Sequence, residues 1–142
     1  MIGSKRAKLV ERIRRREEDV AKAELALRRR ELSNAEHSLL ESLKVIENAG
    51  WESKPLRASD VVLFGSSISG QRAIIARQRV AVRAALELEQ EALAAWQDAH
   101  MHHEGSSRLV EKAVGRETAE ELAQEQTAMD DAGLIRWGRD HS

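Results

Sequence analysis

Trp51-Glu52-Ser53-Lys54-Pro55 is the stretch that decides the fold, because it contains the only proline of the chain. A proline disfavours helical geometry in the residue before it and has no backbone N–H to donate. Neither glycine nor proline occurs in residues 4–49 or in residues 71–104 on the two sides of this stretch. Both regions are rich in Ala, Glu, Arg, Leu and Lys, a composition typical of long helices and coiled coils. The sequence therefore predicts two long helices separated by a bend.

Local signals give the approximate limits of these helices. Ser4 can cap the first helix, and Gly50 can end it in a left-handed conformation. Gly105-Ser106-Ser107 is a candidate break in the second helix, but a glycine costs only ~1 kcal/mol relative to alanine inside a helix. We therefore expect one long second helix. The predicted order within a single domain (1–142) is a helix at about 4–50, a bend at about 51–60, a longer helix at about 61–136 and a frayed tail at 137–142.

Apolar residues recur along both helices in steps of three, four and seven, as on one face of a helix. A five-residue step from Leu27 to Leu32 predicts a stripe that drifts around the first helix, without a strict heptad. The stripes comprise Leu9, Ile13, Val20, Leu27, Leu32, Leu39, Leu43 and Ile46 in the first helix, and Ile68, Ile75, Val82, Leu86 and Leu93, with Trp96 alongside, in the second.

The net charge of −1 conceals a strong segregation of charge. The charged residues of the stretch 5–16 are all basic except for Glu11, and the end of the first helix is acidic. The second helix begins basic and is then acidic almost to its end. An antiparallel arrangement brings opposite blocks together; single exposed pairs contribute only ~0.2–1 kcal/mol each, but several together can set orientation. The predicted fold class is all-α, an antiparallel coiled-coil hairpin with a longer second helix.

Composition argues against several functional classes. Charged residues make up 33% of the chain, with one Phe and no Tyr, so a thick core with a catalytic cleft is not expected. Carboxylates on an open helical surface remain hydrated, which gives no support for general acid–base catalysis. No cysteine is present, no apolar run approaches the length of a membrane span, and the start of the chain has no apolar signal core. We expect a non-enzymatic, cytoplasmic protein that does not insert into the membrane.

Three local patterns have a functional and a structural interpretation. Residues 65–70 (Gly-Ser-Ser-Ile-Ser-Gly) lack the Lys-Ser/Thr of a phosphate-binding loop and are expected to be a hairpin tip or helix start. His100 and His103 share a helical face that could bind a borderline metal, but nothing in the sequence completes the ligand set. The basic residues 5–16 have no interleaved aromatic residues for base stacking, so an acidic protein partner is preferred to nucleic acid. We expect no cofactor, no metal and no nucleic acid.

The tryptophans differ in their expected roles. Trp96 is expected to pack at the seam, whereas Trp51 and Trp137 are candidate exposed anchors for a partner. An alternative to an intramolecular hairpin is a homodimeric coiled-coil scaffold, which is favoured by polar residues near core positions: Arg16, Asn34 and Glu41.

The C-terminal half resembles the second helix of FliJ, the flagellar export stalk family. The resemblance rests on Ala95-Trp96-Gln97-Asp98, on Arg108-Leu109-Val110-Glu111-Lys112, on the polar residues 116–126 and on Met129-Asp130-Asp131-Ala132 followed by Ile135-Arg136-Trp137. Length, bend and the shorter first helix also match, so the resemblance covers essentially the whole chain.

This resemblance implies a stalk or adaptor of the flagellar type III protein export apparatus, in flagellum biogenesis and motility. Its implied partners are a hexameric export ATPase, into which the joined chain ends insert, the cytoplasmic domain of the export gate, and export chaperones. The implied location is the cytoplasm, peripherally associated with the inner face of the cell membrane. The related YscO-type stalk of injectisomes remains an alternative.

The resemblance also implies two sites. An ATPase-facing end would comprise Lys5, Arg6, Arg12, Arg15, Met129, Asp130, Asp131 and Trp137. A gate-docking tip would lie on exposed positions, where the family tends to carry bulkier, aromatic residues: Ser38, Ser42, Val45, Ala49, Ser67, Gln71, Ile74 and Gln78.

Overall fold

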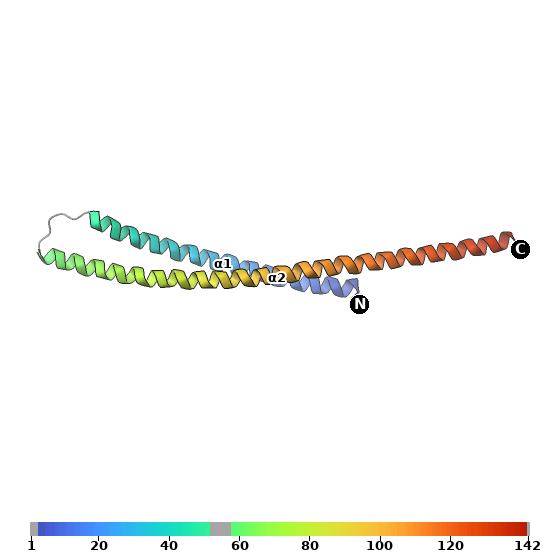
Figure 1. Ribbon diagram of the computed structural model, residues 1–142, viewed down its shortest axis with the longest axis horizontal. Coiled ribbons are helices and arrows are strands. Elements are labelled where there is room, and N and C mark those ends of the chain that lie inside the picture. The colour runs from blue at the N-terminus through green and yellow to red at the C-terminus, as the bar shows by residue number, and fades with distance from the viewer. Residues whose placement is uncertain (1–2, 52–57, 142) are drawn as a thin grey trace. The chain divides into compact units, whose positions relative to one another are not determined.

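Two helices make up the described chain (Figure 1). The computed structural model describes residues 3–51 and 58–141, with the side chains of residues 3–48 and 65–141. Helix α1 comprises Ser4–Trp51 and helix α2 comprises Ala58–Asp140. The all-α class and the longer second helix are confirmed. The proline and most of the predicted bend lie outside the described residues.

Helix α2 runs without a break through Gly105-Ser106-Ser107. Ser106 is buried, so this position is part of the helix pairing. The helix also continues beyond residue 136 to Asp140, where the sequence predicted a frayed tail. A bond in which the amide of His141 donates to the carbonyl of Trp137 (3.2 Å) extends the last turn.

The described chain divides into two compact units: unit 1 consists of Met1–Asp19 and Asp98–Ser142, and unit 2 of Val20–Gln97. In unit 1, the amide of Ser4 donates to Oε1 of Glu117 (2.8 Å), and Glu18 contacts His100 (3.0 Å). Later residues of α1 thus meet earlier residues of α2, which is the predicted antiparallel direction. Ser4 was expected to cap α1 with its side chain; instead, the carbonyl of Gly3 accepts from the amide of Ala7 (3.0 Å), and α2 supplies the acceptor for the Ser4 amide.

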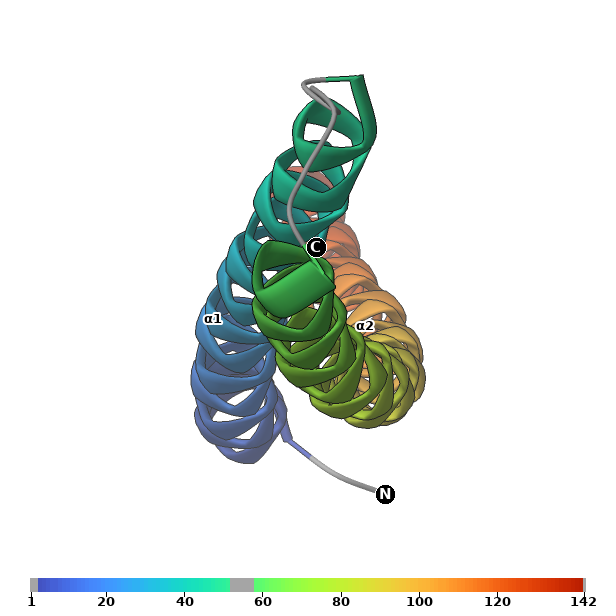
Figure 2. The same ribbon diagram turned by 90° about the vertical axis from the view of Figure 1, so that its left-hand side faces the viewer.

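In unit 2, α1 and α2 lie side by side (Figure 2). Nε of Arg29 donates to Oε1 of Glu89 across the pair (3.3 Å). Leu25 of α1 and Ile75 and Ala92 of α2 are buried. A narrow seam of this kind needs few large side chains, which agrees with a composition poor in aromatic residues.

The seam follows strict alternating steps of three and four residues, the heptad period of a coiled coil, in each unit. The predicted drift was wrong, because the apolar residues chosen from the sequence belong to two faces of α1. Leu9, Ile13, Val20 and Leu27 are exposed, whereas Leu32, Leu39, Leu43 and Ile46 are half-buried. The seam positions of α1 are Ser4, Ala7, Glu11, Arg14 and Glu18 in unit 1 and Ala21, Leu25, Arg28, Leu32, Ala35, Leu39, Ser42 and Ile46 in unit 2. Val10 and Leu43 are half-buried beside this series.

Small side chains dominate the most buried positions of the seam. Ala7 and Ala113 in unit 1 are each 3% exposed, and Ala92 in unit 2 is 7% exposed. A residue without a bulky side chain lets two helix backbones approach closely, so burial here comes from proximity and not from side-chain volume. The polar residues expected near the core are exposed: Arg16, Asn34 and Glu41.

Candidate functional site

The end of unit 1 contains the start of α1 and the last part of α2. The contact between Ser4 and Glu117 fixes the level at which α1 begins. Helix α2 continues to Asp140, and we call residues 118–140 the C-terminal segment. Met129 lies twelve residues beyond Glu117, or about 18 Å along the helix at 1.5 Å per residue. The sequence predicted that basic residues of α1 and C-terminal residues of α2 form one ATPase-facing end. The structure separates the two groups, because α2 continues well beyond the start of α1.

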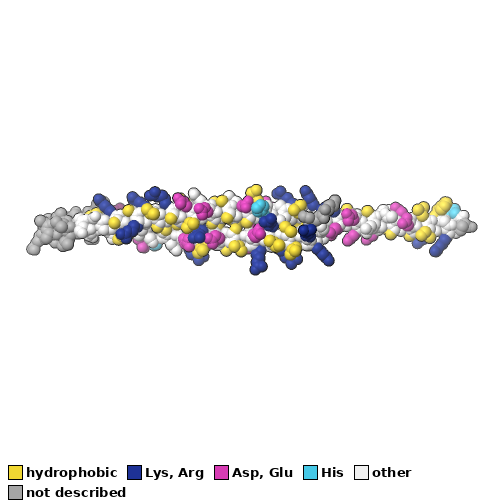
Figure 3. Space-filling model, turned by 90° about the horizontal axis from the view of Figure 1, so that it is seen from below, with side chains coloured by type: hydrophobic (Ala, Val, Ile, Leu, Met, Phe, Trp, Pro, Cys, Tyr) yellow, Lys and Arg dark blue, Asp and Glu magenta, His cyan; other side chains and the backbone are white. Residues whose placement is uncertain are grey.

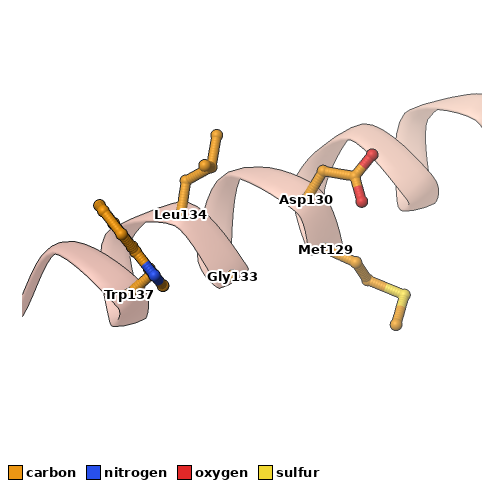
Figure 4. Close-up of a pocket in the computed structure, with 5 residues that line it drawn as sticks. All are labelled: Met129, Asp130, Gly133, Leu134 and Trp137. Carbon is orange, nitrogen blue, oxygen red and sulfur yellow. The ribbon is translucent and has the colours of Figure 1, made fainter. Parts of the chain in front are cut away.

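The C-terminal segment exposes its apolar side chains. Every residue from Glu117 to His141 is exposed, and Met129, Leu134 and Trp137 are 69%, 68% and 63% exposed. With Asp130, these residues surround a shallow hollow at Gly133 (Figure 4). Acidic and hydrophobic side chains share the surface of this end of the molecule (Figure 3). Leu122 is also 61% exposed, although it was not among the residues predicted for the ATPase-facing end.

Local bonds support the helical conformation of this unpaired segment. Hydroxyl groups of Thr118 and Thr127 donate to the carbonyls of Val114 and Ala123 (2.9 Å each), which satisfies the hydroxyls but does not itself stabilise the helix. The side-chain amide of Gln126 donates to Oδ1 of Asp130 four residues later (3.2 Å). The ring of Trp137 stacks on His141 with centroids 4.4 Å apart. The segment thus holds its exposed groups on a helical frame without a second helix beside it.

A second surface lies on α1, on the face turned away from the seam. It is formed by Lys5, Arg6, Leu9, Arg12, Ile13 and Arg16, which we call the N-terminal basic face; all six are exposed. These positions recur at helical spacing and surround two apolar residues with cations. Arg15, predicted as part of the site, is used differently: its Nη2 pairs with Oε1 of Glu11 on the same helix (2.5 Å).

Two histidines of α2 share one carboxylate of α1 at the seam of unit 1. Nδ1 of His100 donates to Oε1 of Glu18 (3.0 Å), and Nδ1 of His103 donates to Oε2 (2.5 Å). Nε2 of His103 lies 3.4 Å from Oε1 of Glu11. The sequence identified the two histidines on one face, but it did not reveal that Glu18 faces them, because no spacing rule links residues 82 positions apart.

This geometry changes the acidity of both partners. Hydrogen bonding from His100 lowers the pKa of Glu18 below its ordinary value, although partial burial opposes this shift. Hydrogen bonding to Glu18 raises the pKa of His100, with a further contribution from Glu104, whose Oε1 lies 3.2 Å from Nε2 of the imidazole. A protonated imidazole beside an ionised carboxylate is therefore favoured, so the cluster acts as an electrostatic clasp between the helices.

The structure also describes most of the other patterns that the sequence singled out. No group of three or more His, Cys, Asp or Glu side chains suitable for a metal occurs among the described residues. Residues 65–70 lie within α2, so their backbone is helical and does not form a phosphate-binding loop. Trp96 is half-buried, as expected for a packing role, and Trp137 is exposed; the side chain of Trp51 lies outside those described.

The predicted gate-docking residues divide between two faces of unit 2. Ser38, Val45, Ser67 and Ile74 are exposed. Ser42, Gln71 and Gln78 were expected to be exposed, but they are half-buried at the seam. Oε1 of Gln78 is buried and has no hydrogen-bond partner among the described residues. The heptad phase explains the difference, because these three residues follow the same alternating steps as the seam. Ala49 lies outside the described side chains.

Comparison with known proteins identifies one family. The model of the flagellar FliJ protein family matches residues 4–142. No curated protein and no solved structure matches the chain. Within the described residues, no helix combines the length and the apolar character needed to cross a bilayer.

Proposed function

The chain belongs to the FliJ family and is related to flagellar protein export, and within that apparatus we propose that it is a non-enzymatic stalk whose C-terminal segment inserts into a hexameric export ATPase. The observation that carries this proposal is the unpaired, fully exposed helix that continues past the start of α1. It is 23 residues long (140 − 118 + 1), or about 35 Å at 1.5 Å per residue. A single helix is only about 10–12 Å in diameter with its side chains, which suits insertion into the pore of a ring.

The surface of the segment supports the same proposal. A helix that enters a ring is surrounded by subunits, so its contacts are distributed around its circumference. Leu122, Met129 and Trp137 supply apolar anchors, and acidic residues separate them. Met and Trp are enriched in interfaces, where each side chain can bury a large apolar area.

A binding and turnover assay with the cognate export ATPase tests this function. Met129→Glu should weaken capture of the ATPase and reduce any change in its ATP turnover, because a charge replaces an apolar anchor. Met101→Glu is the matched control: Met101 is 67% exposed on the same helix but lies outside the C-terminal segment. Equal effects of both substitutions, or no effect of Met129→Glu, would refute the assignment of this segment.

We further propose that unit 2 docks on the cytoplasmic domain of the export gate through the exposed part of the predicted tip. Val45 and Ile74 are the apolar residues of that set and are 50% and 42% exposed. Their replacement by Glu should reduce binding to the gate domain while leaving ATPase capture intact. Binding to export chaperones and peripheral association with the cytoplasmic membrane complete the role that we propose, and membership of the family is the only support for these two parts.

A further inference from the structure

The C-terminal segment has an apolar face that no described part of this chain covers. Leu122, Met129, Gly133 and Trp137 recur at helical spacing along it. A Cβ added at Gly133 would meet no atom within 4 Å, so the packing of this chain does not require glycine there. Glycine weakens a helix relative to alanine. The hollow at Gly133 is the shape that admits an apolar side chain from another helix.

The charge of this segment restricts its possible partners. Residues 117–131 carry carboxylates and neither Lys nor Arg: Glu117, Glu120, Glu121, Glu125, Asp130 and Asp131. Arg136 and Arg139 follow, but residues 118–140 as a whole remain net acidic. Two such segments laid side by side would repel each other, so a basic surface with exposed apolar side chains is the complementary partner.

The N-terminal basic face of this protein has those properties. Leu9 and Ile13 are 52% and 51% exposed and lie between cations. Arg6, Arg12 and Arg16 form no ion pair with any side chain that the structure describes. The face thus presents unneutralised positive charge around two apolar side chains, on the side of α1 opposite Ala7 and Glu11.

The two surfaces cannot meet within one molecule while α2 remains helical. Ser4 is bonded to Glu117, so α1 begins where the C-terminal segment starts. From this point α1 runs back along α2, whereas the segment runs in the opposite direction. A second copy, related by a two-fold axis, would direct its own segment along the first copy's α1.

We propose that this protein self-associates reciprocally, with the C-terminal segment of each copy docked on the N-terminal basic face of the other. Leu9 and Ile13 pack against the hollow formed by Met129, Gly133 and Trp137, and Arg12 and Arg16 pair with Asp130 and Asp131. Such an isologous contact closes as a dimer. This inference rests on the proposed function in one respect: the dimer contact covers the C-terminal segment, which the proposed function assigns to ATPase binding. The dimer is therefore a form in which this segment is not free to bind the ATPase.

Sedimentation equilibrium with purified full-length chain tests the inference without any export component. The wild-type chain should form a dimer whose dissociation constant rises with salt. Arg12→Glu/Arg16→Glu and Asp130→Arg/Asp131→Arg should each raise that constant about tenfold or more, because like charges then face each other. Mixing the two variants should restore dimers, since both contacts of the mixed pair are again between opposite charges.

Arg79→Glu/Arg83→Glu is the control for a change in net charge, since both residues are exposed in unit 2. This variant should dimerise as the wild type does, and circular dichroism should show unchanged helix content in all variants. A wild-type chain that remains monomeric at about 0.1 mM in low salt would overturn the proposal. So would a dimer that is indifferent to both charge reversals, or variants that fail to recombine on mixing.

Discussion

Nδ1 of His100 on α2 lies 3.0 Å from Oε1 of Glu18 on α1. This bond joins the two helices of unit 1 about 27 Å along α2 before the C-terminal segment begins at residue 118. Because His103 donates to the other oxygen of the same carboxylate, one acidic side chain of α1 holds two turns of α2. The pairing of unit 1 therefore depends on protonation as well as on burial.

The first prediction concerns the pH dependence of stability. A raised pKa of His100 contributes stability that is full below its ordinary value of 6.5 and is lost as pH rises through the folded-state value. A lowered pKa of Glu18 contributes stability that is present above its ordinary value of 4.5 and is lost as pH falls through the folded-state value. The clasp should be strongest between these two ordinary values.

Thermal melts of the wild type and Glu18→Gln across pH 4–8 measure this effect. The difference in melting temperature should be greatest near pH 5–6 and should diminish towards pH 8. Glu24→Gln serves as the control. Oε1 of Glu24 pairs with Nε of Arg28 on the same helix (2.9 Å), so this substitution removes a carboxylate without touching the contact between the helices. A difference that is constant over the whole range would mean that the clasp is not ionised as described.

The second prediction compares two leucines on opposite sides of α1. Leu25 is 6% exposed and Leu27 is 42% exposed. Leu25→Ala should lower the free energy of unfolding by about 2 kcal/mol or more, since it leaves a cavity at the seam. Leu27→Ala should cost about 0.5 kcal/mol or less, as a surface substitution does. Urea unfolding followed by circular dichroism distinguishes them, and equal costs would contradict the seam.

The same pair shows where inference from sequence succeeds and where it fails. Proline placement, helix-forming composition and segregated charge were sufficient for the two-helix fold and its antiparallel direction. Choosing the buried face by apolarity selected Leu9, Ile13 and Leu27, which are exposed. The seam of unit 1 instead contains Ala7 and Glu18. Ala7 is buried because α2 approaches closely, and Glu18 can lie at the seam because His100 and His103 of α2 donate to it.

Candidate sites failed for a related reason. Ser42, Gln71 and Gln78 were assigned to an exposed tip by the family resemblance, but the heptad phase places them at the seam. The hollow at Gly133 could not be predicted, because a glycine in a helix pattern is usually interpreted as a weak point. The hollow depends on how Met129, Leu134 and Trp137 are arranged around Gly133, and this arrangement is seen only in the structure.

The third prediction concerns the small residues of the seam. Ala113→Leu should destabilise the protein by about 1–3 kcal/mol, because a larger side chain at a position that is 3% exposed forces the helices apart. Ala119→Leu, at an exposed position on the same helix, should change stability by less than about 0.5 kcal/mol. The free energy of unfolding in urea measures both, and a neutral Ala113→Leu would show that α1 does not approach this part of α2.

The fourth prediction tests the register of unit 1 covalently. Since the chain contains no cysteine, Ala7→Cys/Ala113→Cys introduces a single pair at two of its most buried positions. Mild oxidation should give an intramolecular disulfide, seen as a monomer with altered mobility on a non-reducing gel. Ala7→Cys/Ala128→Cys should not close within one chain, because residue 128 lies about 22 Å farther along α2. Closure of the second pair in preference to the first would exclude the antiparallel register.

Hydrogen–deuterium exchange with and without the cognate export ATPase tests the central claim most directly. At a protein concentration low enough to keep the chain monomeric, amides of residues 118–140 should exchange readily, because no second helix of the same chain covers them, and they should become protected when the ATPase hexamer is added. Amides in the seam of unit 2 should be unchanged. Protection confined to unit 2, with no change in residues 118–140, would contradict the assignment of the C-terminal segment as the ATPase-binding end.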